Sequence, residues 1–402
     1  MDSKKNYGFE QTWRWFGPND PFSLREIKQT GAKGIVTALH QIPVGDVWTI
    51  DDIVKRKQII ETEGFIWSVV ESLPVHENIK KRKGSYEELI ENYKQSIKNL
   101  GECGIHTVCY NFMPILDWSR TNLNVQFRDG SITTKFEMKA FAAFDLFILK
   151  RNGAEKDYTK EQIDKAKEYF KTLNEIQKKE LKDSVMLGLP GSMESYTLDE
   201  FKSALSEYDN IDEAALLRNL FHFLKEIIPA AEQAGVFMTI HPDDPPFSLF
   251  GLPRIVGNKE NIKLILEAVD SPNNGLTLCT GSLGAGYKND LVNITESFVD
   301  KINFVHLRNV VRNEDGDFLE DNHLEGEIDI YAVMKTLLIE QKRRTDEGKG
   351  NMRLPLRPDH GHLLLYDQKI GSIYPGYSLL GRMKGLAELR GLELGIKRSL
   401  EF

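Results

Sequence analysis

Short runs of almost uninterrupted apolar residues alternate along this chain with longer amphipathic segments. One unit recurs: an amphipathic stretch, then glycine, then an apolar run. In "SLREIKQTGAKGIVTAL", for example, Gly31 and Gly34 precede the run at 35–39. Amphipathic periodicity predicts a helix, and a glycine past its end allows the left-handed turn that leads back into a strand. Because the apolar runs lack polar alternation, they are typical of parallel strands buried on both faces.

Eight such strands are predicted, each followed by a helical segment. Eightfold alternation of strand and helix is the pattern of a (β/α)8 barrel, the TIM barrel, in the α/β class. We therefore expect residues 1–402 to form one barrel domain. The predicted strands are Trp13–Phe16, Ile35–Leu39, Ile66–Val70, Thr107–Phe112, Phe237–His241, Leu276–Cys279, Ile302–Leu307 and Leu354–Pro358.

One interval is far longer than a crossover helix requires. Residues 113–235, between predicted strands four and five, are rich in charged helical sequence such as "TKEQIDKAKEYFKTLNEIQKKELK". We interpret this interval as a mostly helical insertion in the barrel. An alternative makes "VMLGLPG" within it a ninth strand, since a short apolar run does not by itself distinguish strand from helix.

Composition indicates which classes of binding partner to exclude and which cellular compartment to expect. The 402 residues carry a formal net charge of -8, which argues against electrostatic binding to nucleic acid or to an anionic membrane. No apolar run reaches the length of about 18 residues that a membrane span needs. The three cysteines, Cys103, Cys109 and Cys279, are too few for a disulfide framework and fit a reducing compartment. We predict a cytoplasmic protein and a homo-oligomer, a dimer or larger, although no sequence feature fixes its size.

Four consecutive predicted strands end on residues that bind metals. Strand five ends at His241, in "VFMTIHPDDPP", strand six at Cys279, and strand seven reaches His306, while Asp359 follows strand eight. The carboxyl ends of barrel strands converge on one face, where active sites lie. Each residue alone has an ordinary structural explanation, but their joint occurrence on successive strands favours a site for Mn, Fe or Zn.

Further polar residues are expected at the same mouth. Strand one contributes Arg14 and Trp15, strand four Asn111, and strand seven Arg308. Arginines around a metal favour a hydroxylated substrate that carries a carboxylate. For Arg120 and Glu71, a salt bridge that closes the barrel is an equally good explanation.

Several long motifs resemble those of the mannonate dehydratases, over nearly the whole chain. They are "TWRWFGPNDP", "GIVTALHQIPVGDVW", "WSVVESLPVHE", "VCYNFMPILDWSRT", "HPDDPP", "LCTGS", "RPDHGH" and "PGYSLLGRMKGLAELRGLELGI". The resemblance implies a xylose-isomerase-like barrel that dehydrates D-mannonate to 2-keto-3-deoxy-D-gluconate in hexuronate (glucuronate) catabolism, with Mn2+ or Fe2+ as cofactor. It also implies that the family's metal ligands fall on the four strand-end residues already selected.

The same resemblance assigns acid–base chemistry to His360 and to Tyr377 of "PGYS". Which of the two is the base and which the acid does not follow from the sequence. Three other functions compete with this assignment. For a metal-dependent isomerase or epimerase we expect carboxylate-rich ligands instead of Cys279, and a DNA-repair endonuclease conflicts with the acidic balance. A binding protein without catalysis is distinguished by a test for turnover.

Overall fold

The computed structural model describes residues 7–188, 196–371 and 373–402, and its centre is a closed barrel of eight parallel strands. In order around the barrel these strands are β1, β12, β9, β8, β7, β4, β3 and β2. All eight predicted strands are present, and the predicted α/β TIM barrel is confirmed. Their bounds are β1 Glu10–Arg14, β2 Gly34–Thr37, β3 Ile66–Glu71, β4 Thr107–Tyr110, β7 Phe237–Ile240, β8 Asn274–Cys279, β9 Ile302–Leu307 and β12 Pro355–Pro358.

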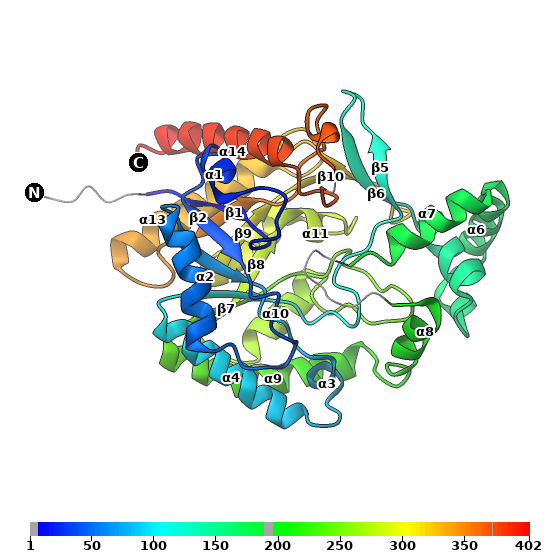
Figure 1. The fold of residues 1–402 in the computed structure, drawn as a ribbon, viewed down its shortest axis with the longest axis horizontal. Coiled ribbons are helices and arrows are strands. Elements are labelled where there is room, and N and C mark those ends of the chain that lie inside the picture. The colour runs from blue at the N-terminus through cyan, green and yellow to red at the C-terminus, as the bar shows by residue number, and fades with distance from the viewer. Residues whose placement is uncertain (1–6, 189–195, 372) are drawn as a thin grey trace, which may run out of the picture.

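Helices surround the barrel, and α6, α7 and α8 gather to one side of it (Figure 1). The helices are α1 Leu24–Lys28, α2 Ile50–Thr62, α3 Glu77–Lys81, α4 Tyr86–Glu102, α5 Met138–Ala143, α6 Lys160–Thr172, α7 Glu175–Val185, α8 Leu198–Ser206, α9 Glu213–Ala234, α10 Lys259–Glu267, α11 Thr280–Gly284, α12 Leu291–Phe298, α13 Ile330–Glu347 and α14 Leu379–Ser399. Short 3-10 or π-helical turns are η1 Phe144–Leu149, η2 Ala154–Asp157, η3 Val299–Lys301 and η4 Asp367–Lys369. No helix within the described ranges combines the length and apolarity needed to cross a membrane.

A second, four-stranded antiparallel sheet was not predicted. Its order is β10-β11-β6-β5, with bounds Asn309–Arg312, Phe318–Asp321, Ile132–Phe136 and Asn122–Gln126. The β5–β6 hairpin comes from the segment between barrel strands β4 and β7, so this segment contains strands as well as helices (Figure 1). We call this sheet the accessory sheet.

The suggested ninth strand does not form where the structure describes it. Val185 is the last residue of α7, and Leu187 and Gly188 lie outside any strand. The rest of "VMLGLPG", residues 189–191, lies outside the described residues.

The connection into β7 shows how local sequence builds the repeating unit. Asp212 caps α9 by accepting a hydrogen bond from the backbone N–H of Ala215 at 2.7 Å. Gly235 ends α9 in the left-handed conformation at φ 62°, where a side chain is disfavoured, and Phe237 then opens β7.

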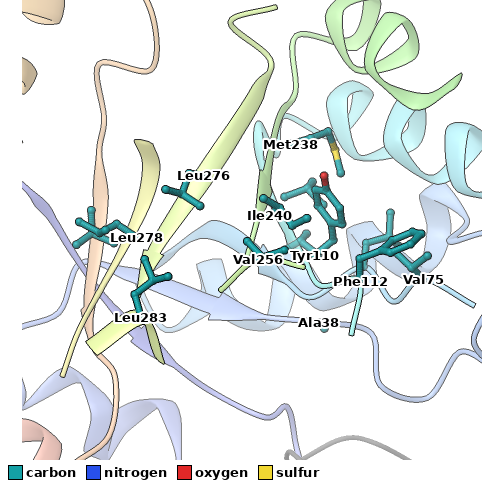
Figure 2. Packing of buried hydrophobic residues seen from close by; sticks show 14 of the residues in the cluster. Ala38, Val75, Tyr110, Phe112, Met238, Ile240, Val256, Leu276, Leu278 and Leu283 are labelled. Carbon is teal, nitrogen blue, oxygen red and sulfur yellow. The ribbon is translucent and has the colours of Figure 1, made fainter. Parts of the chain in front are cut away.

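Alternation along the strands divides outward packing from the barrel interior. Outward-facing Tyr110 and Phe112 pack on Phe223 of α9 at ring distances of 6.0 and 5.8 Å, and Figure 2 shows Tyr110 beside Ile240 and Phe112 beside Val75. Asn111, the one residue between them, faces inward. In the interior, the Thr239 and Thr277 hydroxyls lie 2.7 Å apart, and Thr277 donates to Cys109 at 3.4 Å. Continuing this alternation by two residues brings the chain to the rim.

Candidate active site

Three of the predicted ligands converge at the carboxyl ends of β7, β8 and β9. One ligand atom from each of His241, Cys279 and His306 can be chosen so that all lie within 4.8 Å of one another. His241 and Cys279 each stand two residues beyond an inward-facing threonine, Thr239 or Thr277. The period of two along a strand therefore places them above the interior layer.

Asp359 joins this group from the end of β12. Its Oδ2 lies 3.4 Å from Cys279 Sγ, and its Oδ1 lies 3.9 Å from His306 Nδ1. Arg357 and Arg308 also contact the Asp359 carboxylate, at 2.7 and 3.3 Å. The structure thus brings together all four residues that the sequence singled out.

The imidazole nitrogens fit a cation between them. His241 Nδ1 lies 2.6 Å from the carbonyl oxygen of Pro242, to which it donates, so His241 Nε2 carries a lone pair. His306 Nδ1 lies 3.3 Å from an Arg357 N–H donor and also accepts. These two accepting nitrogens are only 3.2 Å apart. Lone pairs at this distance repel unless a positive charge lies between them, and with the Cys279 sulfur they form a donor set suited to a first-row divalent ion.

Burial sets the protonation of these groups before any metal binds. It lowers the pKa of His241, and burial together with Arg357 lowers the pKa of His306 to about 4, so both rings are neutral at pH 7. Burial and the neighbouring Asp359 carboxylate raise the pKa of the Cys279 thiol. Burial alone would raise the pKa of Asp359, but His360 and the two arginines outweigh it and hold that pKa well below its ordinary value.

Binding of a divalent ion is therefore expected to release about one proton, from Cys279, because a thiol must ionise to ligate. Affinity should rise by about tenfold per pH unit while the thiol pKa lies above the pH. Calorimetric titration of metal into the protein, in buffers of different ionisation enthalpy, counts this proton. Cys279→Ala is the control that should release none, and equal proton release by both proteins would contradict the assignment.

A cavity of about 500 Å³ opens over these groups. Five of the six residues expected to bind substrate or to act in catalysis line it together with His241 and Asp359. The five are Arg14, Asn111, Arg308, His360 and Tyr377.

Trp15 is the exception among the predicted pocket residues. It does not line this cavity; its ring packs under the guanidinium of Arg56 on α2, at 5.5 Å. Arg14 and Phe16 face the cavity, so alternation along the chain turns Trp15 outward. The structure therefore does not place Trp15 at the cavity, where Phe16 lies instead.

The arginines of the cavity differ in whether a carboxylate already pairs with them. Arg308 pairs with Asp244 at 2.6 Å, and Arg357 pairs with Glu71 at 2.8 Å. Arg14 forms no ion pair with any residue that the structure describes; it donates to the main-chain oxygen of Glu71. Arg14 is thus the cavity arginine whose charge is not already offset by a carboxylate.

Salt bridges account for the two residues that the sequence left open. Arg120 is fully buried and pairs with Asp244 and Glu320, both at 2.7 Å. Glu71 lines the cavity but is held by Arg357, which lowers its pKa well below the ordinary value against the opposing effect of burial.

His360 and Tyr377 lie side by side in the cavity wall. Their ring centroids are 5.1 Å apart with an edge-on orientation. His360 Nδ1 lies 2.8 Å from Glu320 Oε2. Burial raises the pKa of Tyr377, so its hydroxyl keeps its proton at neutral pH and can donate it.

Sequence reasoning missed three charged residues of the site, Asp244, Glu320 and Arg357. Arg357 stands two residues before Asp359 in the same strand, so alternation could have found it. Asp244 sits in the quoted "HPDDPP" motif. Glu320 lies on β11, in the sheet that was not foreseen, and carried no comparable signal.

Comparison with known proteins identifies the family of this chain. Residues 9–401 match the model of the D-mannonate dehydratase (UxuA) family. The chain belongs to this family. A mannonate dehydratase of Marinomonas sp. (strain MWYL1) is 53% identical over 392 residues, which cover 97% of this chain and 100% of the relative. Another, of Saccharophagus degradans, is 50% identical over 95% of this chain and 96% of its own.

A solved mannonate dehydratase structure supports the fold as well. The enzyme from Streptococcus suis serotype 2 is 35% identical, with a TM-score of 0.77 over 98% of this chain and 95% of its own. The resemblance seen in the sequence is confirmed, and with it a hydro-lyase that removes water from D-mannonate. Family membership favours this activity over an isomerase, an endonuclease or a binding protein without catalysis.

Proposed function

We propose that the rim of the barrel dehydrates D-mannonate to 2-keto-3-deoxy-D-gluconate, with the two acid–base residues acting beside a metal site. The observation that supports this most strongly is that one cavity is lined by His241 and Asp359 and also by His360 and Tyr377. Mn2+ or Fe2+ would be held by His241, Cys279, His306 and Asp359. Both ions accept a mixed set of imidazole, thiolate and carboxylate ligands.

The difficult step of the reaction is removal of the proton on C2, because this proton is very weakly acidic. A divalent ion at the proposed site supplies Lewis acidity that stabilises negative charge on the carboxylate end of the substrate. Of His360 and Tyr377, one accepts the C2 proton and the other gives a proton to the C3 hydroxyl, which leaves as water. The enol that remains becomes the 2-keto product by tautomerisation.

Arg14 is proposed to bind the substrate carboxylate, because its charge is not offset by an ion pair with a described residue. Arg14→Gln is expected to raise KM by about 10–100-fold, since a hydrogen bond to a charged group contributes about 1.5–3 kcal/mol. Steady-state kinetics with D-mannonate measure this change. The control is Arg25→Gln, an exposed arginine on α1, which should leave KM unchanged. An unchanged KM in Arg14→Gln would remove Arg14 from the carboxylate site.

D-mannonate is expected to be favoured over its C2 epimer, D-gluconate. Only one face of C2 presents its hydrogen to a base fixed in the cavity wall while the substrate's oxygens stay at the metal site. Values of kcat/KM for both acids, measured with the same metal-loaded preparation, test the proposal. Equal values would reject it.

Further proposals cover the domain organisation, the oligomeric state and the location of the protein. We propose one domain over residues 1–402, with residues 113–235 inserted between β4 and β7. Support comes from the accessory sheet, in which β6 of this segment pairs with β11 from beyond the barrel strand β9. A homo-oligomer and a cytoplasmic location are also proposed, the latter supported by three free cysteines, Cys103, Cys109 and Cys279.

A further inference from the structure

Glu320 contacts the proposed acid–base residue although the two come from different sheets. Glu320 lies on β11 of the accessory sheet, and His360 follows barrel strand β12. Glu320 Oε2 and Oε1 lie 2.8 and 3.0 Å from His360 Nδ1, and both side chains are buried. The accessory sheet therefore places a carboxylate against one nitrogen of the ring that lines the cavity.

The Glu320 carboxylate is itself held in place from several sides. Arg120 donates to Oε1 from Nη2 at 2.7 Å and from Nε at 3.2 Å. The Thr133 hydroxyl donates to the Glu320 main-chain oxygen at 3.0 Å, which fixes the backbone as well. Arg120 pairs with Glu320 and Arg308 Nη1 lies 3.3 Å from it, so two guanidinium groups keep this buried carboxylate ionised, and it can only accept hydrogen bonds.

An acceptor at this position determines which nitrogen of His360 carries the proton. Nδ1 must donate to Glu320, because two lone pairs at 2.8 Å would repel. Arg308 Nη1 also lies 2.9 Å from Nδ1, but Arg308 has other acceptors for its protons. Its Nη2 donates to Asp244 at 2.6 Å, and its Nη1 is 3.3 Å from Glu320. In the neutral ring Nε2 then carries the lone pair, and it has no hydrogen-bond partner among the described residues.

We propose that Glu320 is a positioning residue that keeps the proton of neutral His360 on Nδ1 and leaves Nε2 to exchange protons with the substrate. The inference rests on the proposed role of His360. It also gives the accessory sheet a function, since the sheet supplies the carboxylate that the barrel strands do not place at Nδ1.

Glu320→Gln is the first test, because it keeps the shape but offers an amide N–H that can reverse the hydrogen bond. We expect kcat to fall by about 10²-fold, the lower end of the contribution of one general acid or base, with KM and metal content nearly unchanged. Glu325→Gln is the matched control: Glu325 follows the same strand but is exposed and pairs with Arg128, so kcat should stay at the wild-type value. Unchanged kcat in Glu320→Gln would overturn the proposal.

A double-mutant cycle with His360→Asn separates this inference from the proposed function. If Glu320 acts through His360, then Glu320→Gln costs kcat in the wild-type protein and nothing further in His360→Asn. An equal loss in both backgrounds would reduce Glu320 to a structural residue, while His360 would keep its role. If His360→Asn alone keeps wild-type kcat, the proposed function of His360 fails instead.

The hydrogen bond can also be observed without any change at Glu320. In the full-length protein loaded with diamagnetic zinc, 15N NMR of labelled histidine should show His360 with a protonated Nδ1 and an unprotonated Nε2. The signals are assigned by their absence in His360→Asn. The opposite tautomer, with Nδ1 accepting from Arg308, would overturn the proposal even if Glu320→Gln did not fold.

Discussion

Replacing His360 with asparagine is expected to lower kcat by about 10²–10⁴-fold and to leave the metal in place. The reason is that asparagine keeps a polar side chain of similar reach but cannot take up or release a proton near neutral pH. His360 lines the cavity beside Tyr377, whereas Asp359, its neighbour in sequence, contacts Cys279 Sγ at 3.4 Å. Metal content by elemental analysis and kcat are measured on the same preparation.

Asp359→Asn is the matched comparison at the adjacent position. It removes a negative charge that offsets the divalent ion, so metal should be lost and activity should fall as a consequence. A metal-free His360→Asn beside a metal-loaded Asp359→Asn would show that the two roles are exchanged. Near-normal kcat in a metal-loaded His360→Asn would make His360 a structural neighbour of the ligand.

Removing the Cys279 sulfur is expected to have the second large effect. Cys279→Ala should weaken metal binding by more than about 100-fold, because even residues that only support a ligand contribute 10–100-fold. Turnover should fall in parallel at limiting metal and recover in part when metal is in excess.

The control for this variant is Cys109→Ala, a buried cysteine of β4 two residues below the rim, which should keep its metal. A chelator should likewise abolish turnover in the wild-type protein. It should also abolish whatever turnover Cys279→Ala retains. Full metal content in Cys279→Ala would remove the thiolate from the site.

The barrel was predictable because its signal is local. Each barrel strand is a buried apolar run that follows a helix and a glycine, as Gly235 before β7 illustrates. Strand β5, by contrast, alternates between exposed and half-exposed residues and pairs with β6 only in part, so neither apolarity nor length reveals it. The accessory sheet depends on pairing between β6 and β11, which are distant in sequence.

The same contrast between local signals and distant contacts applies to the residues of the site. His241, Cys279 and His306 were found because each ends or nearly ends a strand, and parallel strands bring such positions together. Arg308 was expected to face the substrate; it does line the cavity, but Asp244 and Glu320 surround its charge. Residue type at a strand end does not reveal which opposite charge the folded chain brings to it.

Ion pairs between distant segments are the least predictable part. Arg120 contacts Glu320 across 200 positions of sequence, and no periodicity links the two. The hydrogen bond from His360 to Glu320 has the same character. The position of the proton on His360 therefore depends on tertiary contacts and not on strand register.

The most direct test of the proposed metal-dependent dehydration is the product formed from D-mannonate by the manganese-loaded protein. We predict stoichiometric 2-keto-3-deoxy-D-gluconate, with a rate that follows metal occupancy and is lost in Cys279→Ala at limiting metal. Failure to form this acid, or its formation at an undiminished rate by metal-stripped protein with chelator in excess, would contradict metal-dependent dehydration at this site.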